Sequence, residues 1–217
     1  DYCLTANDIL NFETRLGCKF NCTFCSFEFR NAKKVKDTEQ QRLYTFLQQA
    51  KDRYGITHFS CVDDTFNEDD EKIENLLGAV RQLDYQPTIV GYQRFDVMMA
   101  KTEQIAKLDE CGFHGHFFGI ETLHEQASKV IRKGTRKDRA FEVMQHIRDN
   151  YPHWHTCSAY IIGLPHEPLS HITEVMQHIA RNKLLSSVQP SPLSLELRPG
   201  NELNYALFSK NPESYGI

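Results

Sequence analysis

The 217-residue sequence contains no apolar run long enough to span a membrane, and no signal peptide is visible at its start. It contains no internal repeat, low-complexity tract or linker. Its net charge of −4 provides no general attraction to nucleic acids or acidic membranes. With 40% hydrophobic residues it suits one globular core, so we expect a single domain over 1–217. The abrupt ends are consistent with a domain excised from a longer chain, with an irregular extension over 198–217.

The number of cysteines is odd, which argues against a disulfide framework. The seven cysteines indicate a reducing, cytoplasmic setting. Three of them lie within one loop's reach in a C-x-x-x-C-x-x-C spacing: Cys18, Cys22 and Cys25. The other four are scattered singly, so no second cluster is expected: Cys3, Cys61, Cys111 and Cys157.

Three thiolates in one loop suit a cubane iron–sulfur cluster, in which each iron takes one cysteine sulfur. The fourth iron then keeps an open position for a small chelating ligand. Gly17 allows a sharp turn into the loop, and Phe20 and Phe24 can shield the metal from water. A structural zinc site is the alternative, but zinc commonly takes two pairs of ligands, and no second Cys/His pair lies near these three.

Short apolar runs alternate with longer amphipathic stretches along the chain. The runs predict strands over 12–16, 56–62, 88–92, 113–120, 155–162 and 194–197. The amphipathic stretches predict helices over 38–54, 68–83, 102–110, 125–132, 136–150 and 170–183. Polar residues fall just after the strand ends, where the active sites of (β/α) barrels lie. We therefore predict an α/β fold, a partial (β/α)6 TIM-like barrel with parallel strands and outer helices.

The cysteine spacing, with Phe24 directly before the third cysteine, resembles the radical SAM superfamily. The resemblance implies a [4Fe-4S] cluster on the three cysteines and S-adenosylmethionine (SAM) on the open iron. It also implies an enzyme that cleaves SAM reductively, so that a 5′-deoxyadenosyl radical abstracts hydrogen from a substrate. In this family the residue corresponding to Phe24 packs near the adenine.

The second strand ends in residues that the same resemblance places in the SAM site, and the third strand ends in an arginine able to pair with a carboxylate. Asp63 and Asp64 stand where the family commonly has Gly-Gly-Glu, which receives the methionine amino group. The sequence here looks instead like the Asp-Asp-Thr-Phe variant of methylthiotransferase-like and cobalamin-associated members. One of the two aspartates alternatively caps the next helix. Arg94 is expected to pair with the methionine carboxylate or, alternatively, with Asp96.

The fourth and fifth strands complete the resemblance. Glu121 ends a Gly-Ile-Glu motif whose acid contacts the ribose or methionine. Lys133, with Arg132 as the alternative, corresponds to a base that contacts the carboxylate. Ile162 belongs to an apolar strand that packs against the adenine, and His166 stands where the family has glycine. The alternative for the charged residues is an ordinary solvated surface.

The resemblance implies an electron donor such as a flavodoxin or ferredoxin, and it leaves the substrate unidentified. Two other functions remain open at this point: a zinc-binding interaction module, and a scaffold that binds cluster and SAM without catalysis. A nucleic-acid-modifying enzyme is a third, although the acidic net charge argues against it.

Overall fold

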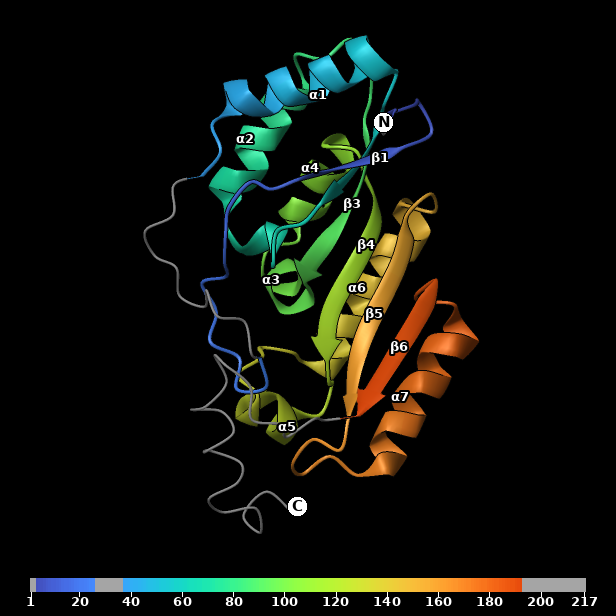
Figure 1. The fold of residues 1–217 in the computed structure, drawn as a ribbon. Helices are drawn as coiled ribbons and strands as arrows, with labels where there is room; N and C mark the ends of the chain where they lie inside the picture. The colour runs from blue at the N-terminus through green and yellow to red at the C-terminus, as the bar shows by residue number, and fades with distance from the viewer. Residues whose placement is uncertain (1–2, 26–36, 193–217) are drawn as a thin grey trace.

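Six parallel strands form one curved sheet in the computed structural model, which describes residues 3–25 and 37–192 (Figure 1). The sheet order follows the chain order, from β1 to β6. The strands are β1 (Ile9–Phe12), β2 (His58–Cys61), β3 (Thr88–Arg94), β4 (Phe113–Glu121), β5 (His155–Ile162) and β6 (Ser187–Pro192). Because β1 and β6 form the two edges, the barrel is not closed, which confirms the predicted partial (β/α)6 barrel.

Helices connect consecutive strands and cover the outer face of the sheet (Figure 1). The helical elements are α1 (Gln40–Tyr54), the 3-10 turn η1 (Phe66–Glu68), α2 (Asp70–Val80), α3 (Phe95–Ala100), α4 (Glu103–Glu110), α5 (Glu125–Val130), α6 (Lys137–Asn150) and α7 (Leu169–Asn182). Among the residues that the structure describes, no helix is both long and apolar enough to cross a membrane.

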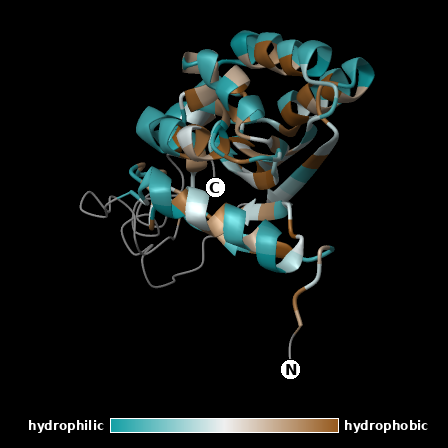
Figure 2. Ribbon diagram, turned by 90° about the horizontal axis from the view of Figure 1, so that it is seen from above, coloured by the Kyte–Doolittle hydropathy of each residue, from teal (hydrophilic) through white to brown (hydrophobic). Residues whose placement is uncertain are grey.

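The helices form where apolar residues recur with helical spacing, and those residues are buried against the sheet. In α1 the buried residues include Leu43 and Leu47, and in α2 they include Ile73 and Leu77. Figure 2 shows hydrophobic residues interspersed with hydrophilic ones along the same helices. Gly55 ends α1 at a φ of 72°, a left-handed conformation that glycine adopts without a steric cost.

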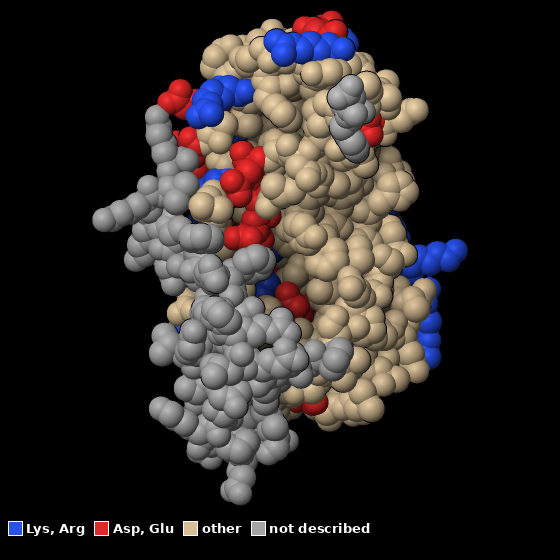
Figure 3. Space-filling model, viewed as in Figure 1, with Lys and Arg blue, Asp and Glu red and all other residues tan. Residues whose placement is uncertain are grey.

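The inner face of the open barrel is apolar and accessible. Along β3, Val90 and Tyr92 are exposed, while their neighbours Ile89 and Gly91 are buried on the helix side. In the view of Figure 1 the surface over strands β3 to β6 carries almost no charge (Figure 3). The alternation of buried and exposed residues along the strands therefore gives the sheet one face packed against the helices and one uncharged inner face.

One predicted strand was placed wrongly, and the sixth strand of the described sheet precedes the stretch predicted for it. The first strand covers Ile9–Phe12 rather than 12–16, because Thr14 hydrogen-bonds the Asp63 carboxylate instead of a neighbouring strand. The last strand covers Ser187–Pro192, whose prolines are tolerated because it is an edge strand. The stretch 194–197, predicted as that strand, and the extension 198–217 lie outside the described residues.

The short helix α3 was not predicted. It begins directly after β3, and its six residues carry only one apolar repeat, formed by Phe95, Met98 and Met99. Such a stretch is too short for periodicity to reveal.

Candidate active site

A cavity of about 160 Å³ lies at the carboxyl ends of the strands, where the cysteine loop meets β3 and β4. All the residues predicted for the site line this cavity except Asp63 and Ile162: Cys18, Cys22, Cys25, Phe24, Asp64, Arg94, Glu121 and Lys133. They come from five separate parts of the chain: the cysteine loop, the ends of β2, β3 and β4, and the turn after α5. The carboxyl edge of the sheet is thus where the predicted chemistry converges.

The cysteine loop is held in place by hydrogen bonds at both ends. Near its start, the backbone N–H of Lys19 donates to Glu68 Oε2 at 2.9 Å. Near its end, Thr23 donates from its backbone N–H to the Ile131 carbonyl and from its hydroxyl to the Val130 carbonyl, at 3.4 and 3.0 Å. The loop therefore bridges the η1 turn and α5. Burial raises the pKa of the Cys18 thiol, the effect expected of a sulfur withdrawn from water.

Arg94, the last residue of β3, reaches the cysteine loop. Its Nη1 donates to the sulfur of Cys22 at 2.8 Å, and its guanidinium carbon lies 3.8 Å from the centre of the Phe20 ring. Asp96 accepts from Nε at 2.9 Å and from Nη2 at 2.6 Å. Burial would raise the pKa of Asp96, but the hydrogen bonds from Arg94 outweigh it and lower the pKa. The predicted pairing of Arg94 with Asp96 is present, together with a thiol contact that was not predicted.

Glu121 and Lys133 face one another across the cavity. Lys133 Nζ lies 3.7 Å from Glu121 Oε1 and donates to the Gly119 carbonyl at 2.9 Å. Burial raises the pKa of Glu121, and the charge of Lys133 opposes that rise. Neither residue is a solvated surface charge, since the side chains are 11% and 4% exposed.

The backbone around Glu121 is strained. Its φ is 66°, a left-handed conformation that is uncommon for any residue other than glycine, and the β4–β5 register shifts between Gly119 and Glu121. Strain of this kind persists only where the surroundings enforce it, and it concentrates at functional sites. A Cβ on Gly119 would stand 2.9 Å from Glu121 Oε1 and 3.2 Å from Lys133 Nζ, so only glycine leaves both tips in place.

The two adjacent aspartates after β2 point to different surroundings. Asp63 is fully buried; its carboxylate pairs with Lys72 Nζ at 2.6 Å and accepts from the Thr14 backbone N–H at 2.6 Å. Asp64 lines the cavity, and burial together with the charge of Asp63 raises its pKa. The cap of α2 is Asp69, which accepts from the Glu71 backbone N–H. The geometry therefore favours Asp64 over Asp63 as a ligand, and neither of the pair caps the helix.

On β5, neither Ile161 nor the predicted Ile162 lines the cavity. Ile161 packs, together with Phe24, against a small buried cluster that contains Ile131 and Leu164. Ile162 is not part of this cluster, because successive residues of a strand face opposite sides. In the following turn His166 adopts a φ of 67°, the left-handed conformation that glycine at this position would take easily.

Sequence reasoning missed several residues of the cavity. Gly119, Tyr92, Gln93, Phe117 and Thr65 all line it. Tyr92 and Phe117 meet edge to face with ring centres 5.1 Å apart, and the Thr65 hydroxyl lies 3.6 Å from the Cys18 sulfur. Thr65 follows Asp64 directly, which was an available signal. The aromatic pair comes from different strands and has no local signature.

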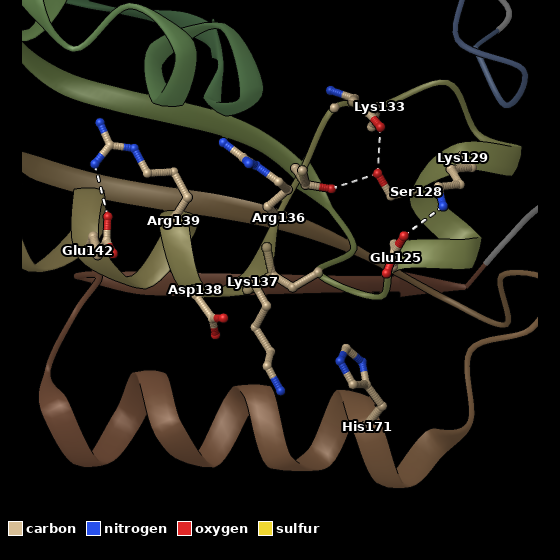
Figure 4. Close-up of a pocket in the computed structure, with 13 residues that line it drawn as sticks. Glu125, Ser128, Lys129, Lys133, Arg136, Lys137, Asp138, Arg139, Glu142 and His171 are labelled. Atoms are coloured by element: carbon tan, nitrogen blue, oxygen red, sulfur yellow. Dashed lines mark hydrogen bonds and ion pairs between the residues drawn. The ribbon is translucent and has the colours of Figure 1, made fainter.

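A larger cavity, of about 870 Å³, lies on the other side of the Lys133 turn, among α5, α6 and α7 (Figure 4). It carries no cysteine. Two of the cations that line it are held by acids of the same helix, Lys129 by Glu125 at 2.6 Å and Arg139 by Glu142 at 2.9 Å. The candidate site is therefore the smaller cavity, since the thiols, the buried acid and the buried base meet there.

The fold and the site together define an enzyme with a cysteine loop at the mouth of a partial (β/α)6 barrel. A family model described as the radical SAM superfamily matches residues 13–179, so the chain belongs to that superfamily. It is accordingly a radical SAM enzyme, and the cofactors of that class are a [4Fe-4S] cluster and SAM.

Individual relatives are more distant. An uncharacterized methyltransferase of Pyrococcus horikoshii is 26% identical over 155 residues, which are 71% of this chain and 33% of that protein. The chain thus spans about a third of the length of this curated relative. Among solved structures, the cobalamin-dependent SAM radical enzyme OxsB matches with a TM-score of 0.65 at 16% identity, covering 94% of this chain and 30% of that one.

A second solved structure gives a similar result. The coproporphyrinogen III oxidase HemN of Escherichia coli, a radical SAM enzyme, matches with a TM-score of 0.60 at 14% identity. The match covers 95% of this chain and 52% of that one. At these identities the structural likenesses establish the shared fold.

Proposed function

We propose that Cys18, Cys22 and Cys25 hold the [4Fe-4S] cluster and that the adjoining cavity binds SAM, which is cleaved reductively to start hydrogen abstraction from a substrate. The observation that carries this proposal is the convergence of the three thiols with a buried acid and a buried base on one cavity. Three thiolates suit three irons of a cubane cluster, which leaves the fourth iron for the amino and carboxylate groups of SAM.

The residues of the cavity fit the polar groups of SAM. Asp64 and nearby backbone carbonyls can accept hydrogen bonds from the N–H groups of the SAM amino group, and Lys133 supplies a cation for a carboxylate. Glu121 can accept from the two ribose hydroxyls. Phe24, packed with Ile161, offers an apolar surface for the adenine. Gly119 leaves room for the acid and the base, as its close contacts with them indicate.

When bound, the cluster supplies the electron that cleaves SAM into methionine and a 5′-deoxyadenosyl radical. The protein positions the ligands and excludes water from them. A flavodoxin or ferredoxin in the cytoplasm is the proposed source of the electron. Because the chain spans about a third of its curated relative, we propose that 1–217 is the catalytic core domain and that substrate choice depends on further parts of the protein.

Methyl transfer is the second candidate for the net reaction. It is favoured by the 26% identity to a protein named as a methyltransferase. Incubation with SAM labelled in its methyl group distinguishes the two, because hydrogen abstraction leaves the label on methionine whereas methyl transfer moves it to the acceptor.

The experiment that tests the proposal is anaerobic reconstitution with iron and sulfide, followed by addition of SAM and dithionite. The expected result is a brown protein that produces 5′-deoxyadenosine. Replacing any one of the three loop cysteines with alanine should abolish the cluster, while the exposed Cys3→Ala variant, the matched control, should retain it.

The alternatives predict different outcomes of the same experiment. A colourless protein that holds only zinc would establish the zinc-binding module. A brown protein that binds SAM without releasing 5′-deoxyadenosine would establish the scaffold.

A further inference from the structure

Arg94 makes a direct contact with one of the three loop cysteines. Its Nη1 lies 2.8 Å from the Cys22 sulfur, within hydrogen-bond distance for a sulfur acceptor. The two residues are 72 positions apart in the sequence, so the contact depends on the fold. The sequence predicted that Arg94 pairs with the methionine carboxylate of SAM or with Asp96, and a contact with a cysteine sulfur is a different role.

The guanidinium is fixed on three sides. Asp96 accepts two hydrogen bonds from its Nε and Nη2, the bidentate arrangement that orients an arginine most firmly. The ring of Phe20 covers one of its faces at 3.8 Å. The side chain of Arg94 is only 6% exposed. With two donors taken by Asp96, the remaining edge is directed at the cysteine loop.

The same network also reaches the turn that carries Lys133. The backbone N–H of Gly134 donates to Asp96 Oδ2 at 3.1 Å, and Gly134 follows Lys133 directly. The loop that carries Cys22 and the turn that carries Lys133 are therefore both anchored to the Arg94–Asp96 pair. The Arg94–Asp96 ion pair is buried at the end of β3, and its contacts with both segments explain why it is not exposed as a surface ion pair would be.

From this geometry we infer that Arg94 is a positioning residue that sets the reduction potential of the cluster through its hydrogen bond to the Cys22 sulfur. The inference rests on the proposed function, since it requires the cluster on the loop cysteines. Hydrogen bonds to the sulfurs and the charge around a cluster determine its potential. The reduced cluster carries one more negative charge, so a cation that donates to its thiolate favours reduction. Arg94 thus makes the cluster easier to reduce.

The test is a redox titration of the reconstituted protein, followed by electron paramagnetic resonance and carried out before SAM is added. Arg94→Gln, which removes the charge and the fork, should shift the midpoint potential to a more negative value. Arg94→Lys keeps the charge but cannot serve both Asp96 and the sulfur, so it should shift the potential less, in the same direction. Lys19→Gln is the control, because it removes a cation of the same loop whose ammonium donates to the Glu68 carbonyl; its shift should be smaller than that of Arg94→Gln.

Each outcome decides a separate question. If Arg94→Gln takes up no cluster, the midpoint potential of the Arg94→Lys variant tests the inference in its place. If the parent takes up no cluster, the proposed function itself is wrong. If the parent is reconstituted and the Arg94 variants keep its potential but bind SAM more weakly, Arg94 is a SAM ligand and this inference is wrong. A Lys19→Gln shift as large as that of Arg94→Gln would also contradict it, because net charge alone would then explain the effect.

Discussion

Replacing Lys133 with methionine tests the cofactor site most directly. The change keeps most of the side-chain volume and removes the ammonium. In the structure that ammonium has three donors, of which one is taken by the Gly119 carbonyl at 2.9 Å. Glu121 Oε1, at 3.7 Å, is too far away for a strong hydrogen bond. Donors of Lys133 therefore remain for a carboxylate that enters the cavity.

The expected loss of SAM affinity follows from the number of free Lys133 donors. Removing one hydrogen bond between charged groups costs about 1.5–3 kcal/mol, which corresponds to a Kd for SAM that is roughly 10- to 100-fold higher. The Lys133→Met change should also raise the pKa of Glu121 further, since Lys133 opposes the effect of burial on that carboxyl. Cluster content should be unchanged, because Lys133 makes no contact with the loop cysteines within the described residues.

The assay is equilibrium binding of SAM to the reconstituted protein without reductant, with iron and sulfide measured on the same samples. Arg132→Met is the matched control, because Arg132 is the neighbouring cation and is exposed. Equal affinity of the Lys133→Met variant and the parent, at equal cluster content, would refute the assignment of Lys133. A loss of cluster in the same variant would instead give Lys133 a structural role.

Three further predictions concern the glycine of the site, the buried ion pair and the pH dependence of stability. Gly119→Ala should weaken SAM binding with little loss of cluster, because the new Cβ would displace the tips of the acid and the base; the same binding assay measures it. Lys72→Met should lower the free energy of unfolding by about 3–5 kcal/mol in urea denaturation of the cluster-free protein, since it strands the Asp63 carboxylate in the interior, whereas the exposed Arg81→Met should change it little. Burial lowers the pKa of His116 to about 3 from 6.5, so the unfolded chain takes up a proton at this residue at a higher pH than the folded chain does. The stabilisation from the neutral, buried His116 is complete above pH 6.5 and is lost as the pH falls towards 3, by roughly 1.4 kcal/mol per pH unit. In chemical denaturation at a series of pH values, the free energy of unfolding should therefore depend less steeply on pH in His116→Phe than in the parent.

Local patterns in the sequence were enough to predict the cysteine loop and the order of strands and helices. The spacing of Cys18, Cys22 and Cys25 places three thiols within one loop whatever the rest of the chain does. The alternation of apolar runs with amphipathic stretches predicts parallel strands, because crossover helices are needed to join them. Glu121 could be placed at the site because it directly follows a predicted strand.

Other features depend on contacts between distant segments, which the sequence does not encode locally. Asp63 and Asp64 are equivalent in the sequence, and only the buried Lys72 and Thr14 distinguish them. The contact between Arg94 and the Cys22 sulfur likewise exists only after β3 and the cysteine loop come together. Desolvation explains the difference: a charged group taken out of water needs a partner, and the fold alone determines which partner lies within reach.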